Sequence, residues 1–218
     1  DSDSRILMQV DGVTKFFEQY RVGSFFSDPD LYKRVEVLRG PASSTLYGAG
    51  ALAGVVHFET KDASDFLKGD DRFAARLRAE LRSNGVGYSG SVILAGKPVG
   101  NLEILGVYSS RELDDYRDGD GNVVAPSGVT SESYLGKVRY NIGGNRGHSL
   151  WASYQNWLSD STQMYDQAAA FGTTPVRRKI DDKTATVGYQ NDFGGSDLIN
   201  IKAQASYADS SVLQTDTT

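Results

Sequence analysis

Alternation of apolar and polar residues recurs along the later part of this 218-residue chain. From Phe73 to Arg82, apolar side chains at odd positions alternate with mostly charged ones at even positions. Successive side chains of a strand point to opposite faces, so this pattern predicts a strand with one apolar and one polar face. Residues 132–142 and 199–207 repeat it. We therefore expect Leu77 and Arg78 to lie on opposite faces of a sheet.

Seven strands are predicted in this part of the chain. They cover 73–83, 87–96, 102–112, 132–142, 148–158, 183–193 and 197–208. Short turns at 97–101, 143–147 and 193–197 alternate with polar loops at 83–87, 112–131 and 159–182. Such alternation is typical of outer-membrane β-barrels, which have short periplasmic turns and longer outer loops. Aromatic residues near the strand ends predict interfacial girdles: Tyr108, Tyr134, Trp151, Trp157, Tyr189 and Tyr207.

Seven strands are too few to close a barrel around a filled lumen, which takes about 22 strands. An open edge in lipid leaves backbone groups without partners, at a cost of several kcal/mol each. We therefore expect the 218 residues to be a fragment of a longer barrel protein.

The first part of the chain has a different character. Short β-type runs at 34–38 and 54–60 flank a segment dense in glycine, alanine and serine, which indicates close packing of backbone on backbone. Residues 5–13 predict another strand ending at an Asp-Gly turn. Ser27 to Asp30 predict a short helix, capped by Ser27 or Asp28 with Pro29 at its first position. Residues 61–71 are expected to form a polar connector.

The run RVEVLRGPASSTLYGAGALAGVVHFETK, residues 34–61, resembles the end of the plug domain of TonB-dependent outer-membrane receptors. The matching residues, to which the resemblance assigns a structural role, are Glu36, Arg39, Gly40, Pro41, Tyr47, Gly48, Gly50 and Gly54. The resemblance implies an all-β membrane protein: the C-terminal part of a plug domain at 1–62, a connector at 63–72, and N-terminal barrel strands at 73–218.

Composition excludes some classes and leaves others open. The formal net charge of -5 gives no support for nucleic-acid binding, which favours basic patches. The absence of cysteine excludes disulfides and thiolate metal sites. The mean hydropathy of -0.40 suits a soluble protein, but it also suits barrel strands that alternate lipid-facing and lumen-facing residues.

No catalytic constellation is visible, so we expect no enzyme activity, resident cofactor or metal site. The run Asp118–Asn122 resembles a calcium loop but lacks the later glycine and glutamate, so an exposed turn is the favoured interpretation. His57, in a predicted strand, is expected to be structural, and His148 lies beside a short turn.

The aromatic segment 14–26 is the better binding candidate. Aromatic rings beside an arginine can hold a flat, partly anionic ligand by stacking and cation–π contact. Tyr20 and Arg21 favour ligand contact, whereas Phe17 and Phe25 favour packing against the barrel; all four remain candidate substrate-binding residues.

By resemblance, the protein is a receptor and active transporter of the bacterial outer membrane, driven by the TonB energy-coupling complex through a segment absent from this chain. The segment 11–67 is similar to the haem and haemoglobin receptor branch, although residues 14–26 lack the histidine that some members use as haem ligand. A ferric siderophore is the alternative ligand, and cobalamin or a carbohydrate comes next. The implied surroundings are the lipid bilayer and lipopolysaccharide. A soluble β-sandwich binding or adhesion protein is the competing class.

Overall fold

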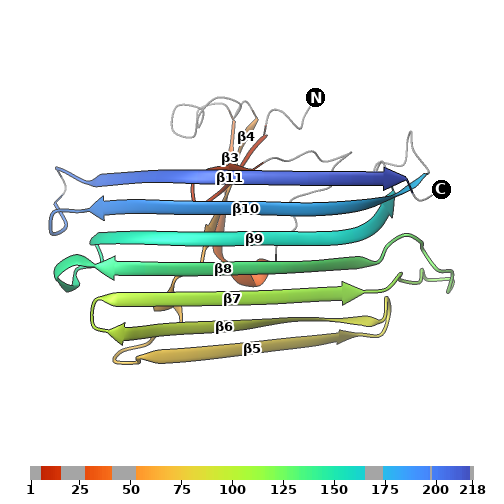
Figure 1. The fold of residues 1–218 in the computed structure, drawn as a ribbon, viewed down its shortest axis with the longest axis horizontal. Helices are drawn as coiled ribbons and strands as arrows, with labels where there is room; N and C mark the ends of the chain where they lie inside the picture. The colour runs from red at the N-terminus through yellow and green to blue at the C-terminus, as the bar shows by residue number, and fades with distance from the viewer. Residues whose placement is uncertain (1–5, 16–27, 41–52, 165–173, 197, 217–218) are drawn as a thin grey trace.

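A computed structural model describes residues 6–15, 28–40, 53–164, 174–196 and 198–216. These residues form two sheets, a four-stranded small sheet and a seven-stranded large sheet. The small sheet lies against one face of the large sheet, with its strands running across those of the large sheet (Figure 1). In the described ranges no helix is long and apolar enough to cross a membrane.

The large sheet is an antiparallel meander in which each strand pairs with its neighbours in sequence. Its strands are β5 (Phe73–Arg82), β6 (Gly87–Val99), β7 (Leu102–Leu113), β8 (Val129–Asn141), β9 (His148–Met164), β10 (Pro175–Asn191) and β11 (Ile201–Asp216). All seven predicted strands are confirmed. The turn at 100–101 and the 114–128 loop lie at opposite ends of the sheet, as the alternation of short and long connections requires (Figure 1).

The largest errors in the predicted boundaries are in three strands, β9, β10 and β11. β9 continues to Met164 and β10 begins at Pro175, so most of the expected loop 159–182 is strand. β11 runs from Ile201 to Asp216, and its polar end pairs fully with β10. These strands of 16 or 17 residues exceed the roughly 9–11 that cross a bilayer. Their outer ends are therefore polar because they extend beyond the expected membrane, and polarity there does not mark a loop.

The small sheet has the order β2-β1-β4-β3. Its strands are β1 (Ile6–Val10), β2 (Val13–Lys15), β3 (Tyr32–Arg39) and β4 (Gly54–Thr60). β1 runs parallel to β4, from the pair Ile6–Gly54 to the pair Val10–Phe58. Asp11 and Gly12 turn the chain between β1 and β2 with φ of 49° and 82°, as the Asp-Gly signal predicted.

The predicted short helix is a 3₁₀ turn, η1 (Pro29–Leu31). The Asp28 carboxylate accepts a hydrogen bond from the Asp30 backbone N–H at 2.8 Å, so Asp28 is the cap and Pro29 takes the first position. η1 ends at Tyr32, where β3 begins. The expected start of this element is confirmed.

An apolar core joins the two sheets. Leu31 and Ala63 from the small-sheet side pack with five large-sheet residues that are at most 4% exposed: Ile93, Ala95, Leu105, Val107 and Leu135. Phe66 and Leu67 pack against the same cluster. The segment expected to be a polar connector therefore contains a 3₁₀ turn, η3 (Ala63–Asp65), that is seated on the large sheet.

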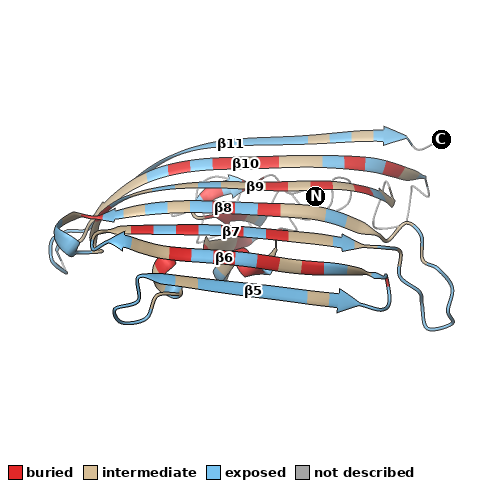
Figure 2. Cartoon of the chain, turned by 60° about the horizontal axis from the view of Figure 1, so that its bottom comes forward, coloured by how far each residue is buried: buried red, intermediate tan, exposed pale blue. Residues whose placement is uncertain are grey.

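Opposite faces of the large sheet have opposite chemistry, as the alternation predicted. In β5, Leu77 is 77% exposed on the outward face, whereas Arg78 points to the small sheet and bonds Asp30. Buried and less buried positions alternate along β6 to β10, while the edge strands β5 and β11 are exposed almost throughout (Figure 2).

Strand register arranges the outward side chains in rows. Three successive rows on β8 to β11 consist of small, aliphatic and tyrosine residues: Gly136, Tyr154, Ala185 and Tyr207; Val138, Ala152, Val187 and Ala205; and Tyr140, Leu150, Tyr189 and Ala203. Beyond them, toward the long loops, lie rows that contain Glu132, Asp181, Asp160 and Lys179. The apolar rows mark the expected level of the hydrocarbon core.

Val138 lies in the middle apolar row, so Val138→Lys is expected to destabilise the inserted protein by about 2–4 kcal/mol. Val99→Lys is the matched control: Val99 is also exposed, but it lies at the short-turn end of β6, where the cost is expected to be about 0–1 kcal/mol. Denaturant titration of the full-length protein in lipid vesicles measures both. Equal losses would contradict the assigned depth.

Gly54 meets a close approach of backbone. A Cβ at this position would lie 2.2 Å from the Leu38 carbonyl oxygen, and its φ is +146°. Gly54→Val is therefore expected to cost at least about 1–3 kcal/mol and to loosen the β3–β4 pairing. Hydrogen exchange on β3 and β4 measures the effect. Gly136→Val is the control, because a Cβ there meets nothing within 4 Å; unchanged protection in Gly54→Val would refute the steric argument.

Candidate functional site

The candidate ligand-contacting residues Phe17, Tyr20, Arg21 and Phe25 lie outside the described residues, so their assignment stays a prediction. The same holds for four residues of the plug motif: Pro41, Tyr47, Gly48 and Gly50. The remaining members of that motif are placed on or beside β3 and β4, in the small sheet.

Glu36 and Arg39 differ in their surroundings. The Glu36 carboxylate lies 3.3 Å from Arg34 Nε, and Arg34 also bonds Glu59 at 2.8 Å, so Glu36 belongs to a charge network on the small sheet. Arg39 is exposed at the end of β3. Gly40 follows with a φ of +91°, and its N–H donates to the Ala53 carbonyl at 3.0 Å, which closes the β3–β4 ladder.

The strongest charge cluster lies where β4 leads into η3 and centres on Asp62, which is 8% exposed. Its carboxylate pairs with cations from both sheets: Arg146 at 3.0 Å, Lys33 at 3.2 Å, Lys137 at 3.4 Å and Arg139 at 3.8 Å. Burial alone would raise the pKa of Asp62, but these cations outweigh burial and lower the pKa to about 2. Asp62 therefore stays ionised and ties the small sheet to β8 and to the 142–147 turn.

Other charged contacts join the sheets toward the long-loop end. Asp30 accepts a hydrogen bond from the Ser91 hydroxyl at 2.5 Å and pairs with Arg78 at 3.4 Å. Lys15 on β2, 5% exposed, pairs with Asp182 on β10 at 2.7 Å and also donates to the Thr184 hydroxyl. Buried charges of this kind need such partners, because an unpaired one costs several kcal/mol.

We call the ion pairs that join the two sheets, at Asp62, Asp30 and Lys15, the ionic seam. The sequence analysis did not predict it. Lys137 and Arg139 were placed correctly on the polar face of β8, but no pattern in the sequence connects them with Asp62, which lies more than 70 positions earlier. The single available signal was the unusual density of cations on a face that a barrel turns inward.

A cavity of about 490 Å³ lies between the sheets, and we call it the inner cavity. Arg139, Trp151 and Lys202 line it from the large sheet, and Arg34, His57 and Asp62 line it from the small sheet. Gln190, opposite Lys202, also lines it and lies near the end of β10, where the chain leaves that strand for β11. The inner cavity is therefore on the short-turn side.

Trp151 and Trp157 were expected in lipid-facing girdles, and this was wrong. Trp157 is 9% exposed on the inward face, and Trp151 lines the inner cavity. A Cβ at Gly188 would lie 2.3–2.6 Å from indole atoms of Trp151, so the ring covers Gly188 along the wall. The outward tyrosines Tyr108, Tyr134 and Tyr207 are 37–70% exposed, which agrees with the girdle prediction.

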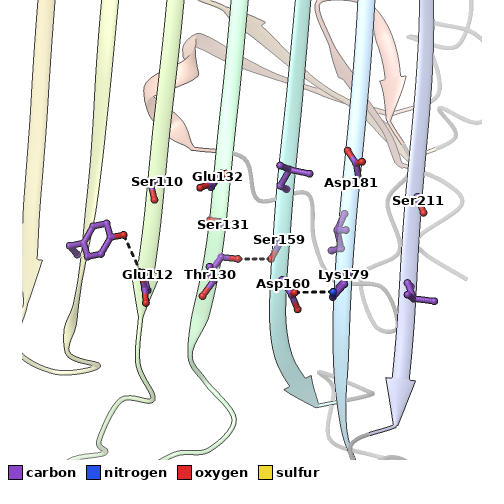
Figure 3. A pocket seen from close by; sticks show the side chains of 14 residues that line it. Ser110, Glu112, Thr130, Ser131, Glu132, Ser159, Asp160, Lys179, Asp181 and Ser211 are labelled. Atoms are coloured by element: carbon purple, nitrogen blue, oxygen red, sulfur yellow. Dashed lines mark hydrogen bonds and ion pairs between the residues drawn. The ribbon is translucent and has the colours of Figure 1, made fainter.

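A second hollow of about 490 Å³ lies on the outward face, away from the small sheet, near the long-loop end (Figure 3). Ion pairs and tyrosine hydrogen bonds surround it: Asp160 lies 3.4 Å from Lys179, and the Tyr88 hydroxyl donates to Glu112 at 3.1 Å. Its position just beyond the apolar rows suits the headgroup region of a bilayer.

The expected turn at Asp118–Asn122 is present. The Asp118 carboxylate accepts backbone hydrogen bonds from Asp120 at 3.0 Å and Asn122 at 2.9 Å, and the Asn122 bonds lower the pKa of Asp118. Within the described ranges, no group of three or more His, Cys, Asp or Glu side chains is placed to hold a metal ion.

The fold and the ionic seam define a class of protein in which a small sheet, the plug, is held against the polar face of a large antiparallel sheet of the membrane type, the wall. Comparison with known proteins supports this class. Residues 1–55 match the family model "TonB-dependent Receptor Plug Domain". The TonB-dependent heme receptor A of Haemophilus influenzae is 31% identical over 221 residues, covering 93% of this chain and 29% of the relative.

Two further proteins extend the likeness. The heme transporter BhuA of Brucella ovis is 34% identical over 144 residues, covering 66% of this chain and 22% of that protein. The hemophore receptor HasR of Serratia marcescens, solved as a double mutant with its hemophore HasA and heme, is 26% identical with a TM-score of 0.81, covering 98% of this chain and 31% of HasR. The chain therefore belongs to the TonB-dependent receptors of the bacterial outer membrane, and the β-sandwich alternative is wrong.

The chain spans about 30% of the length of the heme receptor A and HasR chains that it matches. It comprises plug strands and seven antiparallel strands of a transmembrane β-barrel. The domain boundaries expected at residues 62 and 72 stay predictions.

The pKa of Asp62 is about 2 in the folded protein, below its ordinary 3.8, so its stabilisation is complete above about pH 4 and is lost as the pH falls toward 2. Asp62→Asn leaves the four cations without their carboxylate and is expected to cost about 3–5 kcal/mol at neutral pH. Hydrogen exchange on β4 in the full-length receptor, measured from pH 6 to pH 3, should show early opening in the variant. Asp70→Asn, at an exposed position, is the control; the same opening in both variants would refute the role of Asp62.

Proposed function

We propose that this chain is part of an active transporter that takes up haem across the bacterial outer membrane. The observation that carries the proposal is the extent of the likeness to a heme receptor, which runs over 93% of the chain and so includes the large sheet as well as the plug motif. The second heme-named relative supports the same ligand. A ferric siderophore remains the alternative, and cobalamin or a carbohydrate comes after it.

Recognition is proposed at the plug segment that follows β2. Arg21 can pair with a haem propionate by charge-assisted hydrogen bonds, and a Tyr20 phenolate can ligate ferric iron. Phe17 and Phe25 supply apolar surface for a flat ring. The Lys15–Asp182 pair supports this proposal, because it fixes the residue just before the segment to the barrel wall.

Transport needs movement of the plug, and we assign the driving force to the TonB complex. This force must break the ion pairs of the ionic seam, because Asp62, Asp30 and Lys15 all pair with the wall. No bond of the ligand changes in this scheme, so the protein is not an enzyme. The bilayer and lipopolysaccharide are the proposed neighbours of the outward face, and no nucleic acid takes part.

Haem titration of the full-length receptor, followed by the Soret band, tests the ligand and its site. The variant Tyr20→Ala/Arg21→Ala is expected to weaken haem binding by several kcal/mol with normal insertion, because it removes an iron ligand and a charge-assisted pair. Tyr116→Ala/Arg117→Ala is the matched control, since it removes the same two residue types from the 114–128 loop, where Arg117 bonds the Gly121 carbonyl at 2.9 Å.

Two outcomes would contradict this assignment. Full haem affinity in the Tyr20/Arg21 variant would move recognition to other parts of the receptor. Tight ferric-siderophore binding by a wild-type receptor that gives no Soret shift with haem would replace the proposed ligand with the alternative.

A further inference from the structure

Exposed apolar side chains gather where the chain passes from β10 to β11. Phe193 is 51% exposed, Leu198 94% and Ile199 53%, and we call these three residues the apolar turn. The apolar turn lies at the end of the large sheet opposite the 114–128 loop (Figure 1). Single exposed apolar residues are ordinary on a protein surface, but three in one short connection indicate an interaction surface.

The backbone holds Phe193 in a defined position. Its N–H donates to the side-chain oxygen of Asn191 at 2.8 Å. Two residues beyond the ring, the Gly195 N–H donates to the Asp192 carbonyl at 3.0 Å. Phe193 has a φ of +49°, in the left-handed region that bulky residues rarely adopt. Glycine would form this turn more easily, so the turn geometry alone does not account for an aromatic residue here.

The apolar turn continues the outward face of the large sheet. The last outward row before it consists of His148, Asn191 and Ile201, and the row above contains Tyr189. The polar groups of these rows bond one another: the Tyr189 hydroxyl lies 3.2 Å from His148 Nε2 and accepts a hydrogen bond from Asn191 Nδ2 at 3.3 Å. Aromatic rings with paired polar ends are typical of the level at which hydrocarbon gives way to headgroups.

The length of β10 places Phe193 at this level. Val187 lies in the middle apolar row, and β10 continues from it to Asn191. At about 3.4 Å per residue and a tilt of about 35–45°, this stretch spans roughly 10 Å along the membrane normal. The apolar band of such barrels is about 25 Å tall, so it ends roughly 12 Å from its middle. Phe193 follows Asn191 closely and therefore lies at the periplasmic edge of the band, because the short turns of these barrels are periplasmic.

The rest of the barrel does not account for Phe193. Among the described strands, β11 forms one edge of the large sheet, so a barrel that continues there passes beside Leu198 and Ile199. β10, in contrast, is paired along both edges, with β9 and with β11, and Phe193 comes just after its last residue. The lipid that surrounds the outward face reaches this position directly.

We propose that the apolar turn is an anchor that inserts into the periplasmic leaflet of the outer membrane. Phe193 and Leu198 lie among the first carbons of the phospholipid chains, and Asp192 stays among the headgroups. The anchor fixes the depth of β10, the strand whose Asp182 holds Lys15 of the plug. The inference goes beyond the proposed function, because it rests on membership in the outer-membrane receptors and not on the ligand.

The test measures depth by electron paramagnetic resonance, on the full-length receptor in vesicles of phosphatidylethanolamine and phosphatidylglycerol. A nitroxide is attached at Phe193→Cys, after any cysteine elsewhere in the receptor is replaced by serine. Its collision rates are measured with oxygen, which dissolves in hydrocarbon, and with a nickel chelate, which stays in water. The oxygen-to-nickel ratio is expected to be several-fold higher than at Asp120→Cys, in the exposed 114–128 loop, and lower than at Val187→Cys.

The outcomes separate lipid from water and from protein. Leu198→Cys is the second label, and it decides the matter if Phe193→Cys fails to insert. A ratio equal to that of Asp120→Cys would place the turn in water and overturn the anchor. Low collision rates with both reagents would mean that the rest of the barrel or a second copy covers the turn, which would overturn it as well. Neither result concerns haem, so the anchor can fail while the proposed function stands.

Discussion

The buried carboxylate of Asp62 fixes the orientation of the plug against the wall. Asp62 is surrounded by cations that come from β3, β8 and the 142–147 turn, and it cannot leave them without exposing like charges to one another. The apolar cluster around Leu31 and Ala63 seats the same region on the wall, but it lacks directional preference. The ion pairs supply orientation, because each long side chain reaches Asp62 from a fixed strand position.

The two faces of the large sheet have different surroundings, and each face carries different kinds of side chain. Outward, register lines up small and aliphatic residues in rows bounded by tyrosine and by charge. Inward, the same strands carry arginine, lysine, serine and tryptophan that meet the plug. The two faces must differ, because lipid excludes the charges that hold the plug against the wall. Family membership places this arrangement in the outer membrane, and the ionic seam accounts for how the plug is held against the wall.

The sequence predicts the strands well because their chemistry is local. The alternation around Leu77 and Arg78 depends on neighbours two positions apart, and the Asp11–Gly12 turn depends on two residues. The outer ends of β9 and β10 were missed because water, rather than lipid, surrounds them, so alternation fades there. Trp151 was misplaced because tryptophan suits a girdle and a lumen equally. Contacts such as Lys15 with Asp182 join residues far apart in sequence, and the proposed outer ligand contacts lie outside the described residues.

The parallel pairing of β1 with β4 has a mechanical consequence. β4 is fixed to the wall beyond its C-terminal end, at Asp62, whereas a pull on the chain preceding Ile6 acts at the N-terminal end of β1. The two ends of this parallel pair are thus loaded in opposite directions along the strands. The hydrogen bonds from Ile6 to Val10 would share such a load in shear and would not open one after another from an end. The pairing of β1 with β4 should therefore resist a weak force and break abruptly above a threshold force.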